Sequence, residues 1–87
     1  MALLSPKVIA QVSVQATTEL GVMSWEWIMR ADGQVLYRLA KVNGRREQSP
    51  WTLATRLPAA ELEAIRGDRA KATEALDLIV RQHGHRR

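Results

Sequence analysis

Few residues of this sequence carry side chains suited to covalent or metal chemistry. Its two histidines, His83 and His85, lie two residues apart near the carboxyl end, and the chain has no cysteine. A metal centre needs several ligands held close together, and an activated nucleophile needs a neighbouring base. We therefore expect no metal site, and we interpret residues 83–87 as a frayed polar tail.

The remaining polar residues have simpler explanations than catalysis. Four carboxylates in the last third of the chain fall at positions that a helix would turn toward solvent. These are Glu61, Glu63, Glu74 and Asp77. Gly33 and Gly44 each follow an Asp or Asn residue, which is typical of turns and matches no phosphate-binding motif. The sequence predicts a protein that is not an enzyme and that uses no cofactor.

The residues best suited to binding are two of the three tryptophans, the single tyrosine and several basic residues. Trp, Tyr and Arg dominate protein interfaces, and they also stack on bases and contact phosphates. The candidates for a protein or nucleoprotein partner are Trp25, Trp27, Tyr37 and Arg38. The candidates for nucleic acid are Arg30, Arg38, Lys41, Arg45 and Arg46. Arg56 would extend the second set into a basic stripe across a sheet, although core packing of Trp25 and Trp27 and ordinary basic surface remain the alternatives.

Two dipeptides divide the middle of the chain into strands. Asp32-Gly33 separates residues 24–31 from 34–42, and Asn43-Gly44 separates the latter from 45–55. Asp-Gly and Asn-Gly favour two-residue type I′ turns, whose twist matches that of paired strands. They predict a three-stranded antiparallel meander, with residues 51–55 beyond Pro50 as a short edge strand.

A two-residue turn at Asp32-Gly33 also predicts which residues share a face. Arg30 then lies opposite Val35, and Trp27 lies opposite Arg38, within reach of a cation–π contact. One face would carry Trp25, Trp27 and Met29 beside Leu36, Arg38 and Ala40. The other would carry Ile28 beside Val35, Tyr37 and Leu39, with Glu26, Arg30 and Lys41 at its margins. One helix covers only one face, so the second face requires an amino-terminal helix, a second copy of the chain or a partner.

The segment over residues 7–18 has two interpretations. Apolar residues at every second position, many of them β-branched, predict a half-buried strand. Ser5-Pro6 as a start and Gly21 as a stop instead favour a helix, which would give an α-β-β-β-α arrangement. We favour the strand because β-branched side chains suit it better.

From Pro58 the apolar spacing changes to that of helices over residues 58–83. Gly67 is expected to end a short helix at about residues 59–66, and Asp68 to cap a second at about 69–82. The predicted fold is therefore α+β: a three- to four-stranded antiparallel meander with a C-terminal helix, or two short helices, on one face.

Composition limits the classes of protein that remain. Eighty-seven residues, 46% hydrophobic and 25% charged, are expected to form one globular domain. No apolar run approaches the ~20 residues of a membrane span, and the amino terminus lacks a basic signal-peptide region. We expect a soluble cytoplasmic protein with no membrane partner. Its net charge of +4 suits either nucleic acid or an acidic protein surface.

The predicted arrangement resembles three kinds of binding protein. The meander with Asn43-Gly44-Arg45 at its tip, followed by a helix, resembles the arm-type DNA-binding domains of phage integrases over residues 24–66, which implies a sheet in the major groove. Thr18–Val22 resembles the turn of a winged helix-turn-helix, which implies that Ser24–Arg30 is a recognition helix. In size and in its aromatic and arginine face, the chain is similar in kind to phage inhibitors such as anti-CRISPR proteins, which implies a host protein or nucleoprotein target.

We therefore expect a non-catalytic binding protein. The first hypothesis is an inhibitor of a protein or nucleoprotein complex, and the second is a DNA- or RNA-binding domain. A homodimer is a further alternative for the uncovered face.

Overall fold

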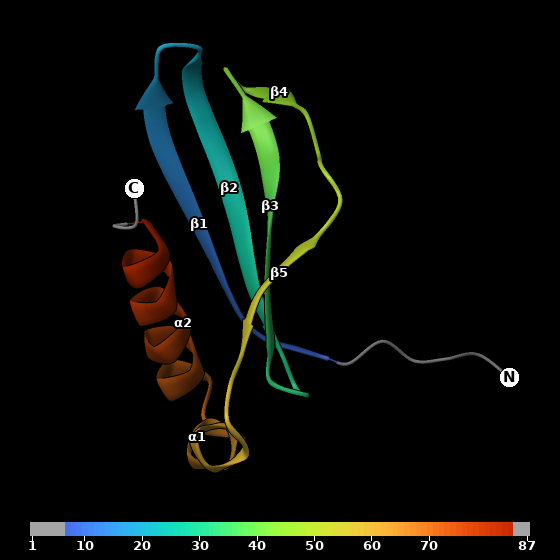
Figure 1. Ribbon diagram of the computed structural model, residues 1–87, viewed down its shortest axis with the longest axis vertical. Helices are drawn as coiled ribbons and strands as arrows, with labels where there is room; N and C mark the ends of the chain where they lie inside the picture. Colours follow the sequence, from blue (N-terminus) through green and yellow to red (C-terminus); the bar gives the residue numbers. More distant parts are fainter. Residues whose placement is uncertain (1–6, 85–87) are drawn as a thin grey trace, which may run out of the picture.

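The computed structural model describes residues 7–84 of the chain. Its elements, labelled in Figure 1, are β1 (Val8–Thr18), β2 (Gly21–Arg30), β3 (Gln34–Val42), β4 (Arg45–Arg46), β5 (Thr52–Arg56), α1 (Ala59–Ile65) and α2 (Arg69–Gly84). The strands form one antiparallel sheet, and α2 packs against one face of it. The α+β class with a C-terminal helix on the sheet is confirmed.

The amino-terminal segment is a strand, as favoured, and not a helix. β1 pairs with β2 from Val8 opposite Arg30 to Thr18 opposite Gly21. Side chains alternate across a strand, and accordingly Val12 packs toward the core while Ser13 is exposed. β2 begins at Gly21 and runs without a break, so residues 24–30 are not a recognition helix and the winged-helix alternative is wrong.

The turn between β2 and β3 differs from the expected type. Its loop has three residues, 31–33, and the Gly33 N–H donates to the Arg30 carbonyl at 2.9 Å. Gly33 has a φ of 90°, whereas Asp32 has no positive φ and accepts the Gln34 N–H on its carboxylate at 3.1 Å. A type I′ turn needs positive φ at both central residues, but a three-residue loop needs it only at its last residue. The Asp-Gly pair therefore makes the longer turn.

This one-residue difference exchanges the faces of β3 relative to β2 from Val35 to Leu39. A register shift between Ser24 and Trp25 then returns Lys41 and Val42 to the register of a two-residue turn. Trp27 lies opposite Tyr37, and Glu26 lies opposite Arg38. The predicted sharing of faces is therefore wrong for residues 35–39, and so is the predicted Trp27–Arg38 contact, whereas Lys41 lies on the face of Glu26 as predicted. One face carries Trp25, Trp27 and Met29 beside Val35, Tyr37 and Leu39, and the other carries Glu26 and Ile28 beside Leu36 and Arg38.

The second turn is the two-residue turn that the sequence predicts. Val42 lies opposite Arg45, and Asn43 and Gly44 have φ values of 51° and 81°. The Asn43 side chain also reaches the turn between β1 and β2. It accepts the Val22 N–H at 2.9 Å and donates to the Leu20 carbonyl at 3.3 Å. Asn43 therefore joins the two hairpin turns at this end of the sheet.

The last strand is interrupted, whereas we expected one strand over residues 45–55. β4 pairs with the end of β3, β5 pairs with its beginning, and residues 47–51 bulge between them. Ser49 bridges the interruption, because its N–H donates to the Leu39 carbonyl and its hydroxyl accepts the Leu39 N–H, each at 3.0 Å. Pro50 cannot donate a ladder hydrogen bond, which is a physical reason for the break.

The boundary between the two helices lies where the sequence predicts it. Gly67 has a φ of 83° after α1, and the Asp68 carboxylate accepts the Lys71 N–H at 3.1 Å at the start of α2. α2 runs to Gly84, so His83 is helical and not part of a frayed tail. His85 and the two arginines after it lie outside the described residues. No helix among residues 7–84 is long and apolar enough to cross a membrane.

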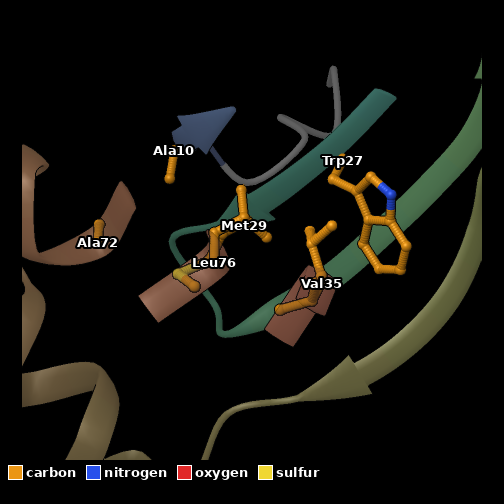
Figure 2. Packing of buried hydrophobic residues seen from close by; sticks show 7 residues of the cluster. Ala10, Trp27, Met29, Val35, Ala72 and Leu76 are labelled. Carbon is orange, nitrogen blue, oxygen red and sulfur yellow. The ribbon is translucent and has the colours of Figure 1, made fainter. Parts of the chain in front are cut away.

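The core lies between α2 and the face of the sheet that carries Trp27. Met29 and Val35 from the sheet and Leu76 from the helix are fully buried, and Figure 2 shows their side chains close together. Ala10 and Ala72 are also buried in this cluster, and their small side chains let α2 approach β1 closely. The opposite face of the sheet has no described helix over it.

Candidate functional site

Three of the predicted binding residues lie on the helix side of the sheet and form an aromatic cluster. The rings of Trp27 and Tyr37 are stacked at 4.8 Å between centroids, and Trp25 lies 6.3 Å from Tyr37. Trp27 is only 5% exposed, whereas Trp25 and Tyr37 are half-buried. Trp27 is thus part of the core, and the other two lie at its border.

His83 completes this cluster, which sequence reasoning missed. Its ring lies 4.9 Å from Trp27 in an edge-on arrangement and 5.3 Å from Tyr37. The signal was its position on α2, seven residues after Leu76 and therefore on the same helix face. The β1–β2 hairpin extends beyond the end of α2 (Figure 1), which leaves an apolar groove of about 360 Å³ beside Trp25, Tyr37 and His83.

Arg38, the fourth predicted binding residue, lies on the opposite face of the sheet. Its Nε donates to Glu26 Oε1 at 2.8 Å, and its guanidinium carbon lies 4.3 Å from the centroid of the Trp51 ring. Its side chain is 22% exposed, so a carboxylate and an aromatic ring hold the guanidinium in place while part of it remains accessible. Sequence reasoning missed Trp51 as a partner because Trp51 belongs to the bulge, whose register no local pattern predicts.

The open face, defined here as the sheet face without a described helix over it, collects most of the basic candidates. Arg46 lies opposite Lys41, Lys41 opposite Ser24, and Arg56 opposite Gln34. Directly paired residues share a face, so these pairs place the basic side chains on the side of Arg38. Five cations therefore share the open face with one strand carboxylate, that of Glu26. The five are Arg30, Arg38, Lys41, Arg46 and Arg56.

Arg45 is the one candidate of the nucleic-acid set that the structure separates from the others. It lies opposite Val42, which pairs with Met23 on the helix side of the sheet. Arg45 and Arg46 are neighbours in the sequence and both exposed, but they point to opposite sides of the hairpin. Substitution of Arg45 or of Arg46 therefore removes the same charge from opposite sides of the sheet.

The centre of the open face is apolar. Ile28 and Leu36 are paired with each other and are 6% and 8% exposed. Leu53 extends this row and is 53% exposed. Exposed Gln11 and Ser13 of β1 adjoin it on the other side. The open face thus combines a small apolar centre, polar side chains and a surrounding set of cations.

The carboxylates of Glu63 and Asp77 lie on the helices and not on the open face. Glu63 and Asp77 pair with Arg66 and Arg81 on the exposed sides of the helices, at 3.2 and 2.8 Å. Within residues 7–84 no cluster of His, Asp and Glu residues is arranged to hold a metal ion.

Comparison with protein-family models, curated proteins and solved structures finds no match to this chain.

Proposed function

We propose that the protein binds double-stranded DNA through the open face, with β2, β3 and the interrupted β4–β5 strand in the major groove. The observation that carries this proposal is the gathering of five cations on the one sheet face without a described helix over it. The proposal adopts the second of the two hypotheses from the sequence, because the register moves Arg38 to the side of Arg30 and Lys41.

The charge of the open face supports a polyanionic ligand. Arg30 and Arg56 lie toward one end of the strands, Lys41 and Arg46 toward the other, and Arg38 lies between them. Lysine and arginine side chains that neutralise phosphates supply most of the affinity of proteins for DNA. Cations at both ends suit contacts to the two phosphate backbones that border a groove.

The dimensions of the sheet favour duplex DNA. Strands lie about 4.8 Å apart, so three strands span about 10 Å between their outer axes, and the major groove is about 12 Å wide. The major groove of an RNA helix is too deep and narrow for side chains to read. Single strands bind through open aromatic rings, whereas the Trp51 ring is already occupied on one side by Arg38.

Arg38 is suited to contact base edges. Arginine forms paired hydrogen bonds to guanine O6 and N7, which is the commonest specific contact in the major groove. Glu26 and Trp51 hold the guanidinium in place, so little side-chain freedom is lost on binding. We expect Arg38→Ala to relax base preference, in addition to weakening binding.

Fluorescence anisotropy with labelled duplex DNA tests the proposal. Affinity should fall steeply between about 50 and 200 mM salt, and each phosphate contact contributes about 0.9 to the slope of log affinity against log salt concentration. Arg46→Ala combined with Arg56→Ala should reduce this slope by about two contacts. The control combines Arg45→Ala with Arg69→Ala, which removes the same charge from exposed positions off the open face.

The paired variants make the outcome decisive. Equal loss of affinity in the two double variants would mean that net charge, and not the open face, governs binding. Absence of binding by the unmodified chain at low salt overturns the proposal. Single-stranded DNA bound as tightly as duplex overturns the placement in the major groove.

The groove beside α2 favours a second candidate, binding of a protein or nucleoprotein complex as an inhibitor would. Trp25, Tyr37 and His83 line an apolar groove, and aromatic residues of this kind anchor protein interfaces. Affinity capture from a nuclease-treated lysate should then retain a protein that Trp25→Ala loses and Trp51→Ala keeps. No difference between these variants contradicts this candidate.

A further inference from the structure

β1 is an edge strand of the sheet, and its outer edge lacks the features that usually prevent pairing with another strand. β1 pairs with β2 on one side, and no described strand pairs with its other side. Natural proteins protect such edges with charged residues, proline, bulges or very short strands, because unpaired backbone groups bind other strands. β1 is 11 residues long and contains neither a charged residue nor proline, and its only irregularity lies at its start, between Val8 and Ala10.

The other edge of the sheet shows these protective features. It consists of two short strands, β4 and β5, separated by a bulge that contains Pro50. Arg45, Arg46 and Arg56 add charge along it. The contrast indicates that the edge at β1 is kept free for a partner strand.

The sequence of β1 shows which strand suits this edge. Residues 10–16 read Ala-Gln-Val-Ser-Val-Gln-Ala, which is the same in both directions about Ser13. In an antiparallel pair of identical strands related by a two-fold axis at Ser13, Gln11 of one copy faces Gln15 of the second copy. Val12 likewise faces Val14, and Ser13 faces Ser13. Each cross-strand pair thus joins two like side chains, and no like charges meet.

We propose that two copies of this chain form a symmetric dimer by antiparallel pairing of their β1 strands about Ser13. Directly paired residues share a face, so the valines of both copies stay on the helix side and the glutamines on the open side. The two α2 helices then lie on one side of a continuous sheet of twice the width. The two open faces lie together on the other side. This proposal does not depend on DNA binding.

Cross-linking tests the register of the pairing, because the chain has no cysteine of its own. Ser13→Cys places two thiols directly opposite each other at the two-fold axis, and mild oxidation should give a covalent dimer in high yield. Thr17→Cys is the control, since that position would face Ile9 of the second copy. Both positions are exposed, so neither change should affect the fold of a single copy.

Charge substitutions test the same pairing without a covalent bond. Gln11→Lys with Gln15→Lys places lysines opposite lysines and should convert the dimer to a monomer with unchanged circular dichroism. Gln11→Glu with Gln15→Lys places opposite charges together and should restore the dimer. Gln82→Lys on α2 is an exposed control that should leave the dimer intact.

Light scattering distinguishes these states by mass. The expected mass for the unmodified chain at micromolar concentration is twice the 9.8 kDa of one copy. A monomer at all concentrations overturns the proposal. So does a dimer that Gln11→Lys with Gln15→Lys leaves intact, or one that Thr17→Cys cross-links as well as Ser13→Cys.

Discussion

Trp27 and Trp51 are large aromatic side chains of the same sheet, but they occupy opposite environments. Trp27 is buried under α2 between Tyr37 and His83. Trp51 lies on the open face and carries the guanidinium of Arg38 on its ring. Since burial sets the cost of truncation, the two residues should respond very differently to substitution.

Truncation of Trp27 should greatly destabilise the fold. We expect Trp27→Ala to lower the free energy of unfolding by about 3–5 kcal/mol, because it removes a buried ring and leaves a cavity. Urea titration monitored by circular dichroism measures this, with Trp51→Ala as the matched variant. A change of less than about 1 kcal/mol for Trp27→Ala would contradict its place in the core.

Among the secondary-structure elements, the two hairpins β1–β2 and β3–β4 act as one unit at their tips. The Asn43 side chain holds the Val22 N–H and the Leu20 carbonyl, so the tip of one hairpin is fixed to the turn of the other. Gly21 has no side chain, and a Cβ there would overlap the Asn43 amide. The backbone at Gly21 also has a φ of 117°, which other residues rarely adopt.

Loss of the Asn43 side chain should loosen this junction without changing the turn. Asn43→Gly keeps the left-handed backbone but removes the two side-chain hydrogen bonds, so we expect a loss of about 0.5–1.5 kcal/mol in stability. The exchange of the Val22 amide hydrogen should accelerate. Asn43→Asp keeps an acceptor for Val22 and should lose less; an equal loss in both variants would mean that the hydrogen bond to Val22 adds nothing.

The start of α2 depends on one side chain. The Asp68 carboxylate accepts the Lys71 N–H, so Asp68→Ala should lower stability by about 1 kcal/mol. Asp68→Asn retains the acceptor and should restore most of the loss in the same urea titration. No difference between the two variants would show that charge, and not capping, accounts for the effect.

In the molecule as a whole, charge is divided between two layers. Glu63 and Asp77 on the helices are balanced by ion pairs, whereas the open face of the sheet carries its cations with a single carboxylate partner. A ligand that is attracted to this face approaches the side opposite α2. Tryptophan fluorescence can show which side a ligand binds, because Trp51 lies on the open face whereas Trp25 and Trp27 lie on the helix side.

Tryptophan fluorescence should locate the DNA. Stacking or close approach of duplex DNA on the open face should quench Trp51 and leave Trp25 and Trp27 little changed. We therefore expect the change in fluorescence on DNA addition to vanish in Trp51→Phe and to persist in Trp25→Phe. The reverse pattern would place the DNA at the groove beside α2.

Much of the fold could be predicted from local patterns. The alternation in β1, the Asn43-Gly44 turn and the Gly67-Asp68 boundary between helices are each decided by neighbouring residues, and all three are confirmed. Asp32-Gly33 is compatible with two turns of different length. We predicted the shorter turn from the sequence, and the error in the predicted faces of β3 follows from that choice.

The candidate sites were predictable in part of their membership, since His83 and Trp51 were missed, and not in their arrangement. Residue type and predicted strand position singled out Trp25, Trp27, Tyr37 and the basic residues, because such side chains dominate protein and nucleic-acid interfaces. Which of them lie together depends on a register set by Gly33, on the bulge that carries Trp51, and on the length of α2. The turn at Gly33 is local but compatible with two registers, and the contacts of Trp51 and His83 join residues distant in the chain, so no local pattern decides the arrangement.

The sequence by itself determined the α+β class, with an antiparallel sheet and a C-terminal helix packed on it. Only the tertiary structure decided that Arg38 lies on the sheet face of Arg30 and Lys41 and not on that of Trp27. The physical reason is that side chains alternate across a strand, so a turn longer by one residue moves the side chains from Val35 to Leu39 of β3 to the other face, whereas a register shift between Ser24 and Trp25 leaves Lys41 where a two-residue turn would place it. A local choice at Gly33 thereby separates the aromatic cluster from the cations.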